Sequence, residues 1–257
     1  MPRSLPLLAV AFSCATPLLF STLGLAAEPV EWKLSRTLPA SEAKQAAAAD
    51  ERFVYAIDNK VVARYDRDSG ERLAISTGDA LHLNSGFLHD GRLYCAHSNY
   101  PRTPEQSEIK VLDLATMKLS TFKDFGSYGG SLTWCIRRDG HWWCNFARYG
   151  DSNSETFLVE FDNHWRELRR FKYPTAVIEK LGTYSLSGGV WRDDVLLVTG
   201  HDDPILFRLR LPKEGDTLDY IDVQRIPFTG QGIAADPVTG GLIGIHRKNK
   251  LLVFASP

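Results

Sequence analysis

Asn84-SGFLHDGRLYCA-His97 contains the pattern that decides the fold of this 257-residue chain. It has a small-residue start, a short apolar segment, a turn and a second apolar segment. Apolar runs of this length, bounded by turn residues, predict two paired β-strands. The stretch therefore predicts a β-hairpin followed by a polar loop.

The same pattern recurs along the chain at Gln45–Asp58, Gly130–Arg148, Ser187–His201 and Gln231–His246. The second strands of the repeats start roughly 40 to 55 residues apart, which is close to the period of propeller repeats. In most repeats a second hairpin follows the first. Four strands per repeat is the composition of a propeller blade.

The last repeat supplies only three strands, because the chain stops soon after Leu251–Phe254. A further strand is available at the other end of the chain, at Val30–Ser35. Pairing the two ends would bury the edges that an open ring leaves exposed. We therefore predict an all-β, five-bladed β-propeller of four-stranded antiparallel blades, with the last blade closed by the N-terminal strand.

Residues 1–27 have the features of a secretory signal peptide. Arg3 is followed by an apolar stretch from Leu5 to Leu25, and small residues end it at Ala26-Ala27. The remaining residues, 28–257, form the predicted propeller domain. Signal-directed export predicts a periplasmic or secreted protein.

The composition narrows the choice of partners. Hydrophobic residues make up 44% of the chain and charged residues 24%, with a formal net charge of −1. A globular domain has this composition, whereas nucleic-acid binding needs a concentrated basic patch. We expect a small-molecule ligand, no nucleic acid, no membrane span and a monomer.

Three cysteines follow the signal peptide, namely Cys95, Cys135 and Cys144. An oxidising compartment permits one disulfide and leaves one thiol over. Asp139-Gly140 favours a two-residue hairpin turn, and counting outward from it places Cys135 opposite Cys144 in a closely spaced pair. A Cys135–Cys144 bridge is predicted, with free thiols or a pairing that involves Cys95 as the alternatives.

One face of the predicted ring is rich in polar residues, where first strands begin and second strands end. Propellers commonly bind ligands on this face. We predict His97, His201 and His246 as catalytic residues, because they occupy equivalent corners of three repeats and histidine titrates near neutral pH. Predicted substrate-binding residues on the same face are Gln45, His82, Asn99, Tyr100, Asn145, Arg148, Asp202, Gln231 and Arg247.

The same corner suggests a metal site. His97, His201 and His246, with Asp58 at the matching place in a fourth repeat, would offer three imidazoles and a carboxylate to zinc or manganese. Alternatively, the three histidines lie apart and the backbone satisfies each of them. The chain contains no G-x-S-x-G, H-E-x-x-H, P-loop or strand-linked G-x-G-x-x-G motif, so no nucleophile arrangement is visible.

The repeats resemble those of exported bacterial propellers of the YVTN/lactonase-like kind, some of which carry a loose "cycloisomerase" label. The residues that carry this resemblance are Tyr65-Asp66 with Ser69-Gly70-Glu71, Leu112-Asp113 with Thr116, the pairs Gly129-Gly130 and Gly188-Gly189, and the strings His97–Pro101 and Gly130–Trp134. Plant-type glutaminyl cyclases are of similar size, but their F-T-Q-G-L signature is absent. The resemblance implies the fold and leaves two functions open: an enzyme acting on a sugar-like or lactone-like substrate, or a non-catalytic binding scaffold.

Overall fold

The computed structural model describes Met1 and residues 31–257, so the predicted signal peptide lies outside the described residues. The described chain is almost entirely β-structure. It also contains one short helix, α1 (Thr175–Ile178), and a 3-10 turn at Gly150–Glu155. The all-β prediction is therefore confirmed for this part of the chain.

Three sheets each contain four consecutive antiparallel strands. The first consists of β6 (His82–His89), β7 (Arg92–Ser98), β8 (Ser107–Asp113) and β9 (Lys118–Gly126). The second consists of β10 (Ser131–Arg138), β11 (His141–Ala147), β12 (Phe157–Phe161) and β13 (Glu167–Lys172). The third consists of β14 (Gly188–Arg192), β15 (Val195–Thr199), β16 (Ile205–Arg210) and β17 (Asp219–Arg225).

The other strands form one sheet of eight, in the order β1-β20-β19-β18-β2-β3-β4-β5. It draws strands from both ends of the described chain. Their bounds are β1 (Lys33–Pro39), β2 (Ala46–Ala49), β3 (Phe53–Ile57), β4 (Val62–Asp66), β5 (Arg72–Ile75), β18 (Thr229–Ala235), β19 (Leu242–His246) and β20 (Leu251–Ser256).

The prediction of a five-bladed propeller made of four-stranded antiparallel blades is therefore wrong. Three sheets have four strands, and the fourth has eight because β18 pairs in parallel with β2 through Gly232 and Ala46. A Cβ on Gly232 would collide with the Cβ of Ala46, so the missing side chain is what lets these two backbones meet. A repeat pattern predicts hairpins along the chain but not a bridge between non-consecutive strands.

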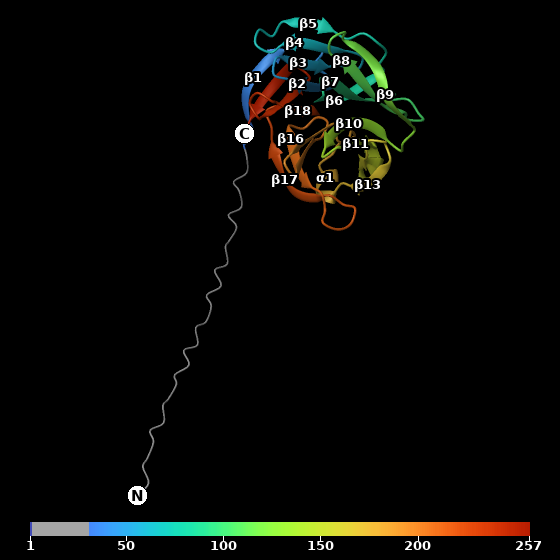
Figure 1. Ribbon diagram of the computed structural model, residues 1–257, viewed down its shortest axis with the longest axis vertical. Helices are drawn as coiled ribbons and strands as arrows, with labels where there is room; N and C mark the ends of the chain where they lie inside the picture. Colours follow the sequence, from blue (N-terminus) through green and yellow to red (C-terminus); the bar gives the residue numbers. More distant parts are fainter. Residues whose placement is uncertain (2–30) are drawn as a thin grey trace.

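The predicted pairing of the two chain ends is confirmed. β1 runs antiparallel to β20, with Thr37 opposite Val253, although the strand begins at Lys33 rather than at Val30. Buried Trp32 anchors its start, because the indole N–H donates to the side-chain oxygen of Gln224 at 2.9 Å. Figure 1 shows β1 lying alongside the strands from the end of the chain.

The tight turn predicted at Asp139-Gly140 is also present. Both residues have positive φ, 51° and 81°, and Asp90-Gly91 repeats this at 47° and 68°. Two-residue hairpin turns of this kind need positive φ at both positions, which glycine and aspartate tolerate. The register that follows places Cys135 directly opposite Cys144.

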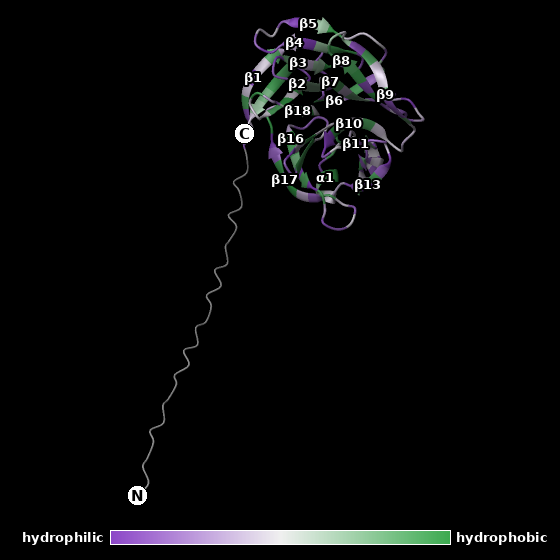
Figure 2. Ribbon diagram, viewed as in Figure 1, coloured by the Kyte–Doolittle hydropathy of each residue, from purple (hydrophilic) through white to green (hydrophobic). Residues whose placement is uncertain are grey.

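Apolar side chains fill the spaces between successive sheets. One layer joins Trp134 and Trp143 of the second sheet to Leu196 and Phe207 of the third, and all four side chains are nearly inaccessible to solvent. Comparable layers lie between the other neighbouring sheets, and one lies between the two halves of the eight-stranded sheet. Figure 2 shows hydrophobic residues along the strands and hydrophilic ones in the outer loops.

Five strands contact one another in sequence around a common axis, namely β2, β6, β10, β14 and β18. We call them the first strands, because each is the first strand of one of the sequence repeats. We call the end where these strands begin the polar end and the end where they finish the apolar end. Within the described residues, no helix has the length and apolar character needed to cross a membrane.

Candidate functional site

A cluster of aromatic side chains lies at the polar end, around Tyr100. The ring centroid of Tyr100 is 5.4 Å from that of His82, 5.3 Å from Tyr149 and 6.4 Å from Tyr184. A hydrogen bond to Tyr184 raises the pKa of Tyr100, and burial raises the pKa of Tyr149 to about 12. Tyr100 and Tyr149 are therefore neutral at physiological pH, with hydroxyls that can donate or accept hydrogen bonds.

His201 joins this cluster and is held in a defined orientation. Its ring lies 4.3 Å from the ring of Tyr184 at an angle of 30°. Nδ1 lies 2.9 Å from a carboxylate oxygen of Asp202, and Nε2 lies 3.4 Å from the Arg247 guanidinium. The ring therefore lies between a carboxylate on one side and a guanidinium, which can only donate, on the other.

His82 lies at the start of β6 and is half-buried. Burial, followed by the positive charges of Arg247 and His201, lowers the pKa of His82 below its ordinary value of 6.5. His82 is therefore a neutral imidazole at neutral pH, next to a fixed cation. A neutral imidazole in this position can accept a proton from a ligand.

Two glutamines predicted to bind substrate instead fix the surrounding backbone. The Gln231 amide donates to the His201 carbonyl at 2.8 Å, and the Gln45 amide donates to the Asn59 side chain at 2.5 Å. Both glutamines are buried, and Gln231 is only 1% exposed. Both glutamines lie beneath the polar end and support it through these hydrogen bonds. Gln231 positions the loop that carries His201.

His97, predicted as catalytic and as a metal ligand, is buried and contacts the protein through both ring nitrogens. Nε2 accepts the backbone N–H of Leu81 at 2.9 Å, and Nδ1 lies 3.0 Å from the Glu108 carboxylate. Burial, together with the nearby charge of Lys110, lowers the pKa of His97 to about 4 even though Glu108 opposes the shift. His97 therefore serves to hold the backbone at Leu81, and we leave it out of the candidate site.

The predicted metal ligands are not brought together. His246 accepts the N–H of Asn249 within its own turn, and Asp58 pairs with Lys44 at 2.5 Å. Across residues 31–257, no three histidine, cysteine or acidic side chains are placed to hold a metal ion.

Three more predicted residues have structural partners of their own. Asn99 closes the loop that follows β7 by bonding to Gln106 and Pro104, and Asn145 is fully buried between Thr133 and Tyr173. Arg148 donates to the Gly129 carbonyl and pairs with Glu155 at 3.1 Å. Of the predicted set, the structure gathers His82, Tyr100, His201, Asp202 and Arg247, with Gln231 beneath them.

Tyr184 is the residue of this cluster that the repeat pattern could not reveal. It lies in the segment between β13 and β14, which interrupts the repeat and contains α1. The one available signal was the pair of tyrosines, Tyr173 and Tyr184, that flank this interruption. Tyr173 is buried and bonds to Asn145, whereas Tyr184 faces the polar end beside His201.

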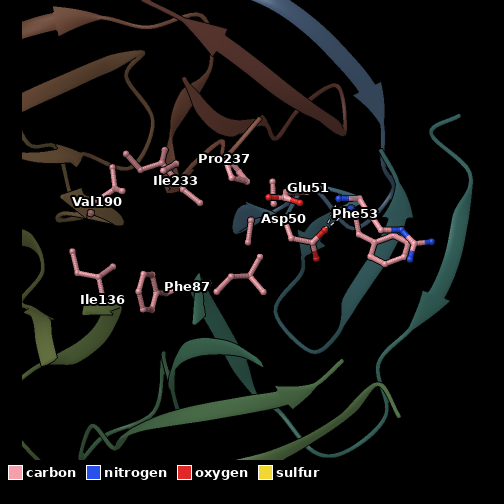
Figure 3. Close-up of a pocket in the computed structure, with 16 residues that line it drawn as sticks. Asp50, Glu51, Phe53, Phe87, Ile136, Val190, Ile233 and Pro237 are labelled. Atoms are coloured by element: carbon pink, nitrogen blue, oxygen red, sulfur yellow. Dashed lines mark hydrogen bonds between the residues drawn. The ribbon is translucent and has the colours of Figure 1, made fainter. Parts of the chain in front are cut away.

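The apolar end contains a feature that the sequence analysis missed. A cavity of about 620 Å³ opens there, with walls from the last residues of β2, β6, β10, β14 and β18 (Figure 3). Its lining is apolar except on the side formed by Asp50, Glu51 and Arg52. Alanine, isoleucine and valine are ordinary core residues and carry no chemistry that marks a site in the sequence, so this cavity was not predicted.

The three described cysteines, Cys95, Cys135 and Cys144, are buried thiols. Cys135 lies opposite Cys144, and burial followed by the charges of Cys144 and Cys95 raises the pKa of its thiol well above the ordinary range. The predicted register is confirmed, and the disulfide itself stays a prediction.

No known family model matches the chain, and no curated protein matches it. Its fold is similar to that of the glutaminyl cyclase of Myxococcus xanthus, with a TM-score of 0.61 and 12% identity over 89% of this chain and 98% of that one. The WD40 β-propeller domain of Doa1 is a weaker match, with a TM-score of 0.46 and 14% identity over 88% and 97% of the two chains. The sheets arranged around an axis and the similarity to the cyclase identify the class: this is a β-propeller.

Proposed function

We propose that this propeller binds a small sugar-like ligand that carries an anionic group, at the polar end, and catalyses an acid–base reaction on it. The observation that carries this proposal is the placement of Arg247, His201 and His82 beside three tyrosine rings. The arrangement combines a cation, two imidazoles and apolar ring faces within one small region.

Arg247 supplies the anion preference. Within residues 31–257 no acidic side chain forms an ion pair with it, and its polar contact is with Nε2 of His201 at 3.4 Å. A guanidinium binds a carboxylate through two parallel hydrogen bonds, which a neutral ligand cannot reproduce. An anionic ligand would therefore gain a charge-assisted contact that the protein itself does not use.

The tyrosine rings supply the shape preference. Tyr100, Tyr149 and Tyr184 are mutually tilted at 70° to 76°, so their rings lie in several orientations within one cluster. A tyrosine ring offers an apolar face and a polar tip, which suits the alternating C–H and O–H groups of a sugar. This supports a sugar acid, or the lactone of one, as the class of ligand.

The two imidazoles supply the chemistry. His82 is neutral because its pKa is lowered, so it can take a proton from an attacking water or a ligand hydroxyl. His201 has the Asp202 carboxylate 2.9 Å from Nδ1 and the Arg247 guanidinium 3.4 Å from Nε2, and we propose that a ligand anion bound by Arg247 would lie beside Nε2. An imidazole oriented by a carboxylate is the arrangement used by general bases in many enzymes.

Binding without turnover is the second candidate function. The observation in its favour is that His97, the residue predicted at the equivalent corner, is fully engaged with Leu81 and Glu108. In that case the polar end would recognise the ligand and do no chemistry on it. For both functions we propose an exported protein, on the strength of the signal-peptide features of residues 1–27.

The test is calorimetric titration of the purified protein with D-glucuronate and with D-glucose, a pair that differs in the carboxylate. We expect glucuronate to bind at least about tenfold more tightly, which corresponds to about 1.4 kcal/mol. Arg247→Gln should remove the difference. The matched control is Arg148→Gln, because Arg148 lies on the same face but is already paired with Glu155.

Equal binding of the two sugars, or an unchanged preference in Arg247→Gln, would contradict the proposed ligand class. Catalysis is tested separately by following the opening of D-glucaro-1,4-lactone, which keeps a free carboxylate, above its spontaneous rate. His82→Gln and His201→Gln should slow the opening while they preserve glucuronate binding. Binding with no rate above background would favour the non-catalytic function.

A further inference from the structure

The cavity at the apolar end is separate from the polar cluster. The first strands run from the polar end to the apolar end, and the cavity lies where they finish, at the opposite end from the polar cluster. Figure 3 shows Phe87, Ile136, Val190 and Ile233 grouped on one side of the cavity. They come from β6, β10, β14 and β18, so the wall is assembled from several sheets.

These wall residues are firmly held. Ile136 is 4% exposed, Val190 is 9% and Ile233 is 2%, while Phe87 is half-buried. The adjoining glycines are themselves tightly packed, so the cavity is not a packing gap beside them. A Cβ on Gly86 would collide with Ile57, and a Cβ on Gly189 would collide with the Trp134 ring. The cavity is therefore a preformed feature of a well-packed wall, since its side chains are fixed by the layers behind them.

The polar groups at the rim are largely satisfied within the chain. Asp50 accepts the N–H groups of Arg52 and Phe53 and the hydroxyl of Tyr55, so its carboxylate has little capacity left for a ligand. Figure 3 shows Asp50 turned toward Phe53. The exposed Glu51 and Arg52 carry opposite charges, and the remaining carboxylate, Asp50, is engaged within the chain, so the rim offers no free charge for a charged ligand.

We propose that the apolar end is a second binding site, which takes an uncharged, mainly apolar small molecule. The occupant is a small molecule rather than a protein surface because the wall side chains are almost inaccessible. A flat partner could touch the rim but could not reach Ile136 or Ile233. The volume of about 620 Å³ lies within the range of small-molecule sites.

The character of the lining makes this occupant more favourable than water. A water molecule needs two to four polar partners, and the walls formed by Phe87, Ile136, Val190 and Ile233 offer no polar side-chain group. An apolar ligand would release the water from these walls and gain close contacts with them. The site thus differs from the polar end in ligand chemistry as well as in position.

The test uses N-phenyl-1-naphthylamine, an uncharged apolar dye that fluoresces when it leaves water. We expect saturable binding of one dye per chain. Ala235→Trp should weaken dye binding at least about tenfold, because Ala235 lies at the exposed end of β18 and lines the cavity. Phe87→Ser, which removes a wall ring, should weaken it as well.

The matched controls are Ala115→Trp, at an exposed turn between β8 and β9, and Phe122→Ser, which removes an exposed ring from β9. Both should bind the dye as the unmodified protein does. Arg247→Gln should also leave dye binding unchanged, and glucuronate should not displace the dye. This separates the site from the polar end.

Three results would overturn the proposal. They are non-saturable dye binding, equal binding by Ala235→Trp and Ala115→Trp, and a stoichiometry of one dye per two chains. The last would mean that a second copy of the chain covers the cavity. Circular dichroism of each variant distinguishes a lost site from a lost fold.

Discussion

Gln231 and His201 are joined across two sheets: the Gln231 amide donates to the His201 backbone carbonyl at 2.8 Å. Gln231 belongs to β18 of the eight-stranded sheet, and His201 follows β15 of a neighbouring sheet. The bond fixes the loop that carries Asp202 and the imidazole of His201. The polar end is thus held in place by a buried residue that need not touch the ligand.

Gln231→Met should destabilise the protein, because it leaves the His201 carbonyl without its donor. The expected loss in the free energy of unfolding is about 1–2 kcal/mol, the cost of an unsatisfied buried polar group. Urea denaturation measures it, with the exposed Gln106→Met as the control. An unchanged unfolding midpoint would show that the bond contributes nothing to stability.

Deleting residues 31–39 should expose the edge of β20 and cause aggregation, because an unpaired edge strand recruits other chains. Size-exclusion chromatography measures this as a loss of monomer. Leu34→Ser is the control, since Leu34 is 57% exposed and its replacement keeps the backbone pairing. A stable monomeric truncation would mean that β1 is dispensable.

Cys135 and Cys144 should be joined in protein recovered from an oxidising compartment, with Cys95 left as a thiol. The two residues face each other across β10 and β11, in the closer kind of cross-strand pair. Peptide mapping without reduction measures the linkage. A linkage that includes Cys95 would mean that the strands rearrange before oxidation.

Acid should weaken the fold through His97. Its pKa is about 4 in the folded state and about 6.5 when exposed, so the unfolded chain takes up a proton first. Stability is therefore full above about pH 6.5 and falls as the pH drops toward 4, by about 2 kcal/mol between pH 7 and pH 5 from this group.

His97→Gln should remove that part of the pH dependence, because a glutamine oxygen can still accept the Leu81 N–H but does not titrate. Urea denaturation at pH 7 and at pH 5 measures both proteins. The difference between the two pH values should be smaller for the variant. Identical differences would show that His97 is not the group responsible.

The sequence predicted the hairpins and the pairing of the chain ends because these depend on local patterns. Alternating apolar runs and the Asp139-Gly140 dipeptide specify strands and turns without reference to the rest of the chain. The parallel bridge between Gly232 and Ala46 could not be predicted in this way. It depends on how closely two distant backbones approach, and no residue near Gly232 indicates its partner.

The candidate site was predicted in part for a similar reason. His82, Tyr100, His201 and Arg247 lie at or next to predicted strand ends, and this predicted that they share the polar end. The sequence could not tell that His97 would be taken up by Leu81 and Glu108, since those contacts come from neighbouring loops and strands. The apolar cavity was missed because it consists of ordinary core residues, and concavity is a property of the assembled sheets.

The eight-stranded sheet has a consequence for how the protein is made. β1 is the first strand to be synthesised and β20 the last, so the sheet that unites them must wait for the whole chain. Contacts between residues this far apart along the chain form slowly, because the closure of a long loop costs entropy before the contacts stabilise it. Until then β2, β18 and the apolar layers beside them are open to other molecules. A protein built in this way depends on protection while it folds more than its finished stability would suggest.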